Sequence, residues 1–245
     1  MKIAVITAMP EEYRAVIACF GTVLASRTGY FVFAGHEFVL VESGMGPDNA
    51  AKATEALLLD AVPPDLIVSA GFCGGIAPEL QVGDVVVASK IIVADINGFE
   101  EIFFPLSVSG RTFVVRQADI GKRTYGGTFV STAVLMSKRE LAGVLPNRYH
   151  FPVVEMESGS IGKVAAEHNI PLLAIRTVSD SSLEELSFSL DELCDRDMRR
   201  IRLHKVLLTV LRKPYIIPQL MRLSRSSRIA AENLTNALTS LFPTL

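Results

Sequence analysis

Cysteine and histidine are scarce in this sequence, and neither forms a recognisable metal-binding motif. The 245 residues hold three cysteines, at positions 19, 73 and 194, and four scattered histidines, with no CxxC or HExxH pattern. Few, widely spaced cysteines are typical of a reducing compartment, where disulfides do not persist. We therefore expect no disulfide framework, no metal site and no cofactor.

Long apolar runs and a strong excess of one charge are also lacking. The apolar start, Ile3 to Met9, is shorter than the hydrophobic region of a signal peptide. No run approaches the roughly 20 residues that cross a bilayer. The net charge is −2, which does not indicate a nucleic-acid-binding surface. We expect a cytoplasmic protein that binds no nucleic acid.

The pattern that is present indicates a large α/β domain. Hydrophobic residues make up 49% of the chain and charged residues 20%, a globular balance. Lys2–Ala8, Asp65–Ala70 and Pro171–Val178 are apolar runs typical of strands covered on both faces. Helical segments lie between the strands. The sequence predicts a three-layer αβα sandwich with a mixed central sheet, as a single domain spanning residues 1–245.

Acidic residues follow several of the predicted strands. Glu12 comes after the first, Glu155 to Glu157 after a short one, and Asp180 at the end of the last. In an open α/β sheet, ligands bind beyond the carboxyl ends of the strands. Read singly, Glu12 is most simply an acid at a helix start and Asp180 a cap or turn residue. The glycine-rich segment Gly71–Gly75, predicted as a loop, fits neither GxGxxG nor the P-loop, so it gives little support for dinucleotide or ATP binding.

Together, five ordered motifs carry more information than any one of them. They are Met1–Glu12, Ser43–Gly46, Asp65–Ala77 with Val82–Val86, Val154–Ser158, and Arg176–Asp180. In this order they resemble the nucleoside phosphorylase/nucleosidase family, especially the methylthioadenosine/S-adenosylhomocysteine nucleosidases. The resemblance runs from Met1 to about Glu192. It implies an enzyme that cleaves the N-glycosidic bond of an adenosine-type purine nucleoside, with family-like association into homo-oligomers.

The resemblance also implies roles for individual residues. Asp180 would protonate N7 of the purine, and Ser179 would help to orient it. Glu157 would bind the ribose hydroxyls, with Met156 packed against the sugar. Glu12 would deprotonate the attacking water. A general acid of this kind must hold a proton near neutral pH, which burial or nearby negative charge promotes.

Two further segments are candidates to bind the purine base and to position the nucleophile. The strand near Gly126–Val130 resembles the family's base-binding strand, so Phe129, next to Val130, is a candidate to stack on the purine. The alternative is that Phe129 is an ordinary core residue. Backbone N–H groups around Gly74 would position the nucleophile or a sugar oxygen.

The nucleophile is either water or phosphate. Family members carry a hydroxyl residue where this chain has Phe72, whose ring offers no hydrogen bond. Phosphate needs converging cationic and hydrogen-bond donors, and Glu12 would repel it. The residues therefore favour water, and a phosphate-dependent reaction remains the alternative.

A basic amphipathic stretch distinguishes the C-terminal part, at about 194–228. Residues 196–228 carry a charge of +9, so the rest of the chain carries −11. The stretch reads either as a helical insert, exposed to solvent or in contact with another subunit, or as a surface that lies on an anionic membrane. A membrane-facing nucleosidase resembles the hopanoid-associated branch of the family, the adenosylhopane nucleosidases, whose substrate has a lipid at the 5′ position.

Overall fold

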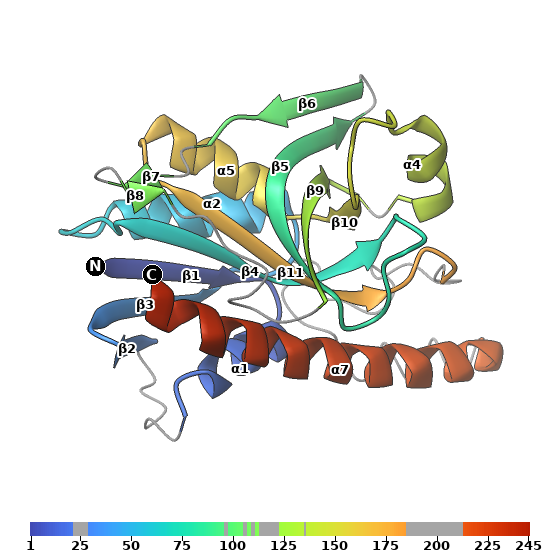
Figure 1. Cartoon of the computed structure of the whole chain (residues 1–245), viewed down its shortest axis with the longest axis horizontal. Coiled ribbons are helices and arrows are strands. Elements are labelled where there is room, and N and C mark those ends of the chain that lie inside the picture. Colours follow the sequence, from blue (N-terminus) through green and yellow to red (C-terminus); the bar gives the residue numbers. More distant parts are fainter. Residues whose placement is uncertain are drawn as a thin grey trace.

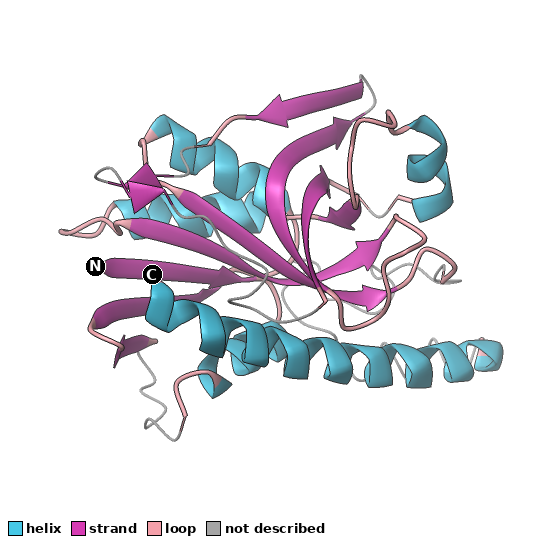
Figure 2. Ribbon diagram, viewed as in Figure 1, coloured by secondary structure: helices cyan, strands magenta, loops and turns pink. Residues whose placement is uncertain are grey.

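A mixed β-sheet with helices on both faces organises the chain (Figures 1 and 2). The computed structural model describes residues 1–21, 29–95, 98–104, 107–108, 111–112, 123–134, 136–184 and 213–245. Its 9-stranded sheet contains β1 (Lys2–Thr7), β2 (Tyr30–Phe33), β3 (His36–Glu42), β4 (Leu66–Gly75), β5 (Val85–Asp95), β6 (Gly98–Ile102), β9 (Thr124–Thr132), β10 (Val153–Glu155) and β11 (Leu172–Asp180). A separate two-stranded sheet pairs β7 (Ser107–Val108) with β8 (Arg111–Thr112).

Strand β4 lies at the centre of this sheet. The strand order is β10-β9-β5-β11-β4-β1-β3-β2, with β6 paired to β5. β4 runs parallel to β1 and β11, whereas β5 is antiparallel to β11. β10 pairs with both β9 and the end of β4, so part of the sheet closes on itself. This closure brings the ends of β4, β10 and β11 together.

The helices form the two outer layers. α2 (Pro47–Leu58) and α5 (Ser158–Glu167) cover one face; α1 (Pro10–Ala18) and α7 (Ile217–Leu241) cover the other (Figure 1). One apolar core therefore unites α1 and α7 with the sheet through residues such as Val16 and Leu234, and a second unites α2 and α5 with it through Leu57 and Ile161. The short α4 (Lys138–Val144) lies outside these layers, and α7 is flanked by the 3₁₀ turns Pro214–Ile216 and Phe242–Thr244. The expected αβα architecture with a mixed sheet is confirmed.

The first helix shows how local sequence positions a functional side chain. Pro10 occupies the first turn of α1, where its missing N–H costs no hydrogen bond. Glu12, two residues later, accepts a hydrogen bond from the backbone N–H of Met9 at 2.9 Å. Such a contact satisfies one of the N–H groups that a helix start leaves unpaired. Glu12 is thereby turned back toward the end of β1.

One expectation about the elements is wrong. Gly71–Gly75 is not a loop: it is the last half of β4 and is fully buried, because β11 and β10 pair with it. The last helix begins at Ile217, so residues 217–228 of the basic stretch belong to it. The basic stretch up to residue 212 lies outside the described residues.

Candidate active site

Glu12 is a buried carboxylate held by backbone N–H groups. Its Oε2 accepts from the N–H groups of Ala8 and Met9 at 2.8 and 2.9 Å, and its Oε1 accepts from that of Phe72 at 2.8 Å. Burial raises the pKa of Glu12 above its ordinary value, while Arg176 and these N–H groups act in the opposite direction. A carboxylate with a raised pKa that is held in one orientation is suited to accept a proton.

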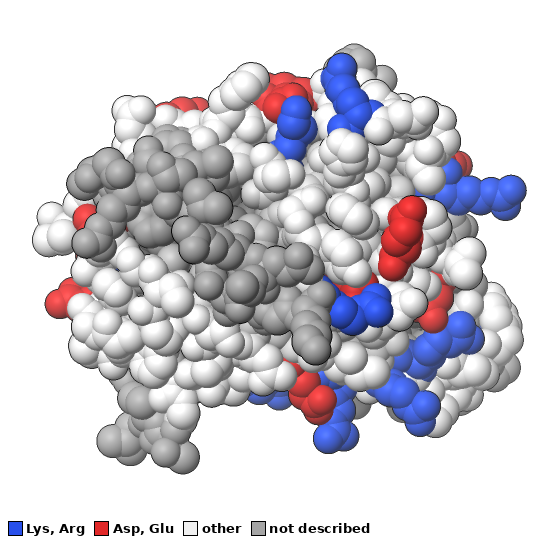
Figure 3. All heavy atoms as spheres, in the orientation of Figure 1, with Lys and Arg blue, Asp and Glu red and all other residues white. Residues whose placement is uncertain are grey.

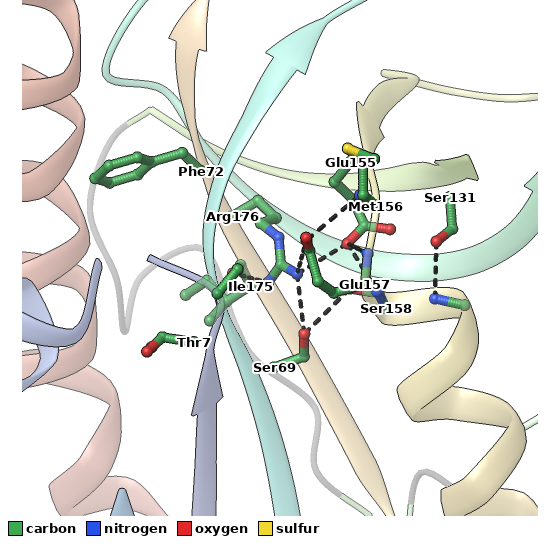
Figure 4. A network of polar contacts seen from close by, with 12 residues as sticks. Thr7, Ser69, Phe72, Ser131, Glu155, Met156, Glu157, Ser158, Ile175 and Arg176 are labelled. Carbon is green, nitrogen blue, oxygen red and sulfur yellow. Dashed lines mark hydrogen bonds and ion pairs between the residues drawn. The ribbon is translucent and has the colours of Figure 1, made fainter. Parts of the chain in front are cut away.

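Arg176 is the buried cation at the centre of the acidic residues (Figure 4). Its guanidinium lies 2.8 Å from Glu155 and 3.7 Å from Glu157, and it also donates to the hydroxyl of Ser69 at 3.0 Å. Buried charges are stable only when they are paired and hydrogen-bonded. Arg176 therefore provides the positive charge that allows several carboxylates to share this end of the sheet.

The carboxylates of Glu155 and Glu157 contact the starts of two helices, α5 and α2 respectively. Glu155 accepts from the backbone N–H groups of Glu157 and Ser158 at 3.1 and 2.8 Å, which completes the first turn of α5. Glu157 accepts from the N–H of Gly46 at the start of α2, at 3.0 Å. Burial, and then the charge of Glu155, raise the pKa of Glu157 to about 7.

Asp180 ends β11 and is held at both carboxylate oxygens. Ser179 donates its hydroxyl to Oδ1 at 2.7 Å, as expected for a residue that orients Asp180. Lys138, the first residue of α4, lies with its ammonium 2.5 Å from Oδ2. The charge that contacts Asp180 is thus a cation rather than the nearby negative charge expected beside a general acid. The side chain of Asp180 keeps 25% of its surface exposed, so it remains accessible to a ligand.

Two glycines of β4 leave the space that these carboxylates occupy. A Cβ on Gly71 would lie 2.5 Å from Oε1 of Glu12, and one on Gly74 would lie 3.1 Å from Oδ2 of Asp180. Gly74 also pairs with Asp180 and Val154 in the sheet. Both acids therefore contact one strand, at positions three residues apart. At a rise of about 3.3 Å per residue, these two positions of the strand are roughly 10 Å apart.

Three of the expected site residues belong to apolar clusters. Phe129 and Val130 are both fully buried, in two different core clusters. The ring centroid of Phe129 also lies 6.0 Å from the guanidinium carbon of Arg176, so this residue borders both the core and the charged cluster. The ring of Phe72 packs with the core on the α1 and α7 side and points away from the Arg176 network (Figure 4). Met156 is half-buried and precedes Glu157, and its place beside the sugar stays a prediction.

Arg176, Glu155 and Lys138 are the participants that sequence reasoning missed. Arg176 stands in an otherwise apolar strand, and a charged residue inside such a run is the signal that would have identified it, because it requires a buried partner. Glu155 belongs to the motif Val154–Ser158, but the sequence assigned it no role in the site. Lys138 belongs to a helix that the sequence did not predict, and no local pattern ties it to Asp180.

Neither a metal cluster nor a membrane-spanning helix is found in the described part of the chain. Among its residues, no group of three or more His, Cys, Asp or Glu is arranged to hold a metal ion. None of its helices is both long enough and apolar enough to cross a membrane.

Comparison with known sequences identifies relatives over most of the chain. The model of the phosphorylase superfamily matches residues 2–212. A 5′-methylthioadenosine/S-adenosylhomocysteine nucleosidase of Listeria welshimeri is 31% identical over 214 residues, which cover 78% of this chain and 91% of the relative. The corresponding enzyme of Bacillus cereus is 28% identical, with 80% and 93% covered.

Solved structures share the fold at lower identity. The 5′-methylthioadenosine/S-adenosylhomocysteine nucleosidase of Neisseria meningitidis, in complex with methylthio-immucillin-A, superposes with a TM-score of 0.65 at 22% identity, covering 100% of this chain and 99% of that one. A futalosine hydrolase of Helicobacter pylori also gives a TM-score of 0.65, at 15% identity, covering 100% and 98%. At these identities the likeness concerns the fold.

Proposed function

Because the chain belongs to the phosphorylase superfamily, we propose that it cleaves the N-glycosidic bond of an adenosine-type purine nucleoside and releases the base. The relatives that match most of its length are named as nucleosidases of this kind. The observation that carries the proposal is that the carboxylates of Glu12 and Asp180 contact the two ends of one glycine-rich segment of β4, at Gly71 and Gly74. Glu12 follows β1 and Asp180 ends β11, and both strands run parallel to β4, so the two acids belong to the same end of the sheet, beyond which ligands bind in open α/β sheets.

The chemistry follows from the positions of the carboxylates. Asp180 gives a proton to N7 of the purine as the electron pair of the glycosidic bond moves onto the base. Glu157 accepts hydrogen bonds from the ribose hydroxyls, which strengthen as positive charge develops on the sugar. Glu12, with its raised pKa, takes a proton from the attacking water. Arg176 prevents the acidic residues from repelling one another out of place.

Water is the nucleophile that this site supports. The one buried cation near Glu12 among the described residues is Arg176, and it already pairs with Glu155 at 2.8 Å. A phosphate would have to share that cation with Glu12, Glu155 and Glu157, at a cost in electrostatic free energy. A phosphate-dependent reaction is the other outcome that the assay below distinguishes.

The assay measures adenine release from 5′-methylthioadenosine and adenosine, with and without phosphate. We expect release in the absence of phosphate. Glu12→Gln and Asp180→Asn should each lower kcat by about 10²–10⁴-fold. Glu11→Gln is the matched control, because Glu11 is exposed in the same turn of α1 and pairs only with Arg14 among the contacts described. Wild-type protein that releases no base from any purine nucleoside would overturn the proposal, and release only with phosphate would assign the phosphorylase reaction.

We extend this proposal to a substrate that carries a lipid at the 5′ position, of the adenosylhopane type, presented at a membrane. The residues of α7 that are buried start at Ser226, so Ile217–Arg225 extends beyond the core. This extension exposes Met221 by 70%, next to Arg222 and Arg225. Lys and Arg side chains gather on the surface where α7 begins (Figure 3). Basic and apolar side chains on one exposed helix end suit an anionic bilayer.

Vesicle co-sedimentation tests the membrane contact. We expect binding to vesicles that contain phosphatidylglycerol, weakened by the triple change Arg222→Gln, Arg225→Gln, Arg228→Gln and by Met221→Ser. Leu59→Ser is the control, since Leu59 is 87% exposed at the end of α2. Equal sedimentation of wild type and the α7 variants would exclude this surface.

The same proposal includes association into homo-oligomers, as its family resemblance implies. Two exposed apolar side chains support this association: Phe103 is 82% accessible and Leu183 is 92% accessible. Large apolar side chains are favoured in subunit interfaces. Sedimentation velocity at micromolar concentration should give a dimer or larger species; a monomer throughout would contradict it.

A further inference from the structure

Lys138 is a buried lysine whose ammonium is directed at Asp180. Only 7% of its side chain is exposed, although lysine is almost never buried unless it is paired. Its Nζ donates to Oδ2 of Asp180 and to the backbone carbonyl of Ser181, each at 2.5 Å. One side chain of α4 thus holds both the carboxylate at the end of β11 and the backbone that follows it.

The surroundings of this pair are shaped to contain it. A Cβ on Gly74 would lie 3.2 Å from Cδ of Lys138 as well as 3.1 Å from Oδ2 of Asp180, so a larger residue would press on both partners. Ser179 contacts the other oxygen of Asp180, and its hydroxyl also lies 3.2 Å from the carbonyl of Cys73. The carboxylate of Asp180 is therefore held by hydrogen bonds from residues of two elements, α4 and β11.

Stability alone does not account for a buried ammonium at this position. A buried ion pair is on average no more stabilising than well-packed apolar residues of the same volume. An apolar side chain in place of Lys138 would also fill the space beside Gly74. The orientation of Asp180 is what such a side chain could not supply.

We propose that Lys138 is a positioning residue for Asp180 in the release of the base. The inference rests on the proposed function. In the reaction, the carboxyl group of Asp180 gives its proton to N7 as the C1′–N9 electron pair moves onto the purine. The products at this end of the site are a neutral base and the Asp180 carboxylate. Lys138 keeps all its protons: its ammonium fixes the direction of the carboxyl group and faces the negative charge that forms there.

The test compares two leaving groups in the same variant. Purine release from 5′-methylthioadenosine needs a proton from Asp180, whereas nitrophenolate leaves a p-nitrophenyl riboside as a stable anion. For Lys138→Met we expect kcat on the purine substrate to fall by about 10- to 100-fold, with a much smaller change in KM. The nitrophenyl substrate should lose less than about 3-fold, and Lys138→Arg should restore part of the purine activity. Because both rates come from one sample, their ratio is independent of the fraction folded.

Two controls make the outcome specific. Asp180→Asn should lose at least as much activity as Lys138→Met on the purine substrate and should likewise spare the nitrophenyl substrate. Lys163→Met, which changes an exposed lysine paired with Glu100 on the surface, should alter neither rate. Equal losses on both substrates would reduce Lys138 to a structural residue, and unchanged rates would also overturn the inference. Either result requires an active wild type, so it is distinct from failure of the proposed function, in which wild type releases no base.

Discussion

The Oε1 atom of Glu12 accepts a hydrogen bond from the backbone N–H of Phe72 at 2.8 Å, although the two residues are 60 positions apart in the sequence. The family resemblance implies a hydroxyl residue at this position, whereas the ring of Phe72 offers no hydrogen bond. The structure places the ring in the apolar core and uses the main chain for the contact with Glu12. The contact therefore requires the backbone position of β4 rather than a polar side chain.

Gly71→Ala should disable Glu12 through this contact. The new Cβ would lie 2.5 Å from Oε1 of Glu12 and 2.8 Å from its Cδ, closer than a Cβ approaches a non-bonded atom. Glu12 would have to leave its three N–H donors. We expect kcat for base release to fall about as far as in Glu12→Gln, with a loss of roughly 1–3 kcal/mol in the free energy of unfolding.

A glycine in another strand of the sheet provides the comparison for this substitution. Gly126 in β9 has no heavy atom within 4 Å of its would-be Cβ. Gly126→Ala should keep the wild-type rate and stability, measured by base release and urea unfolding. A fully active Gly71→Ala would show that the position of Glu12 is not needed.

Arg176→Met should destabilise the fold by leaving the carboxylates uncompensated. Removing one partner of a buried ion pair costs about 3–5 kcal/mol. Glu155 is the closest partner, at 2.8 Å, so the double variant Arg176→Met, Glu155→Gln should recover part of that loss. Urea unfolding of the four proteins gives the coupling free energy directly. If the losses of the two single variants simply add, Arg176 is not the counter-charge of Glu155.

The contrast between Glu12 and Lys138 explains how far the sequence could predict this site. Glu12 follows a strand and a proline at a helix start, so its direction is set by residues within four positions. The contact of Lys138 with Asp180 joins residues 42 positions apart. It depends on the closure of β10 onto β4, which no local periodicity encodes.

Glycine has a similar ambiguity. The run Gly71–Gly75 suggests a loop because glycine weakens strands. In the structure the same residues continue β4, since the absence of a side chain at Gly71 and Gly74 makes room for Glu12 and Asp180. The need for that space arises from other elements and is visible only once they are assembled.

Phe129→Leu distinguishes the two interpretations of this ring. Phe129 is fully buried among residues such as Val153 and Ile161, so the smaller side chain should leave a cavity and lower the free energy of unfolding by about 1–2 kcal/mol. If Phe129 is only a core residue, KM for 5′-methylthioadenosine should stay within about 2-fold, because no ring-to-base stacking of about 1 kcal/mol is lost. A KM that rises at least 5-fold, with stability unchanged, would restore the stacking role.

The stability of the wild type should depend on pH through Glu157. Burial, then the Glu155 carboxylate, raise the pKa of Glu157 to about 7 in the folded chain, from 4.5 for an ordinary glutamate. Between these values the folded state binds more protons than the unfolded state, so the free energy of unfolding falls as pH rises. Above pH 7 the charged form is present in both states, and the penalty reaches its limit of about 3 kcal/mol.

Glu157→Gln removes this titration and serves as the reference. Urea unfolding of both proteins at pH 5, 6, 7 and 8 gives the free energy of wild type minus variant at each pH, so that groups common to both cancel. We expect that difference to decline steadily from pH 5 to pH 7 and to level off by pH 8, because Glu157 is then fully ionised in the folded state. A difference that stays constant would mean that Glu157 is already ionised at pH 5. In that case Arg176 and the N–H of Gly46 would outweigh burial, and the ribose hydroxyls would meet a carboxylate at every pH tested.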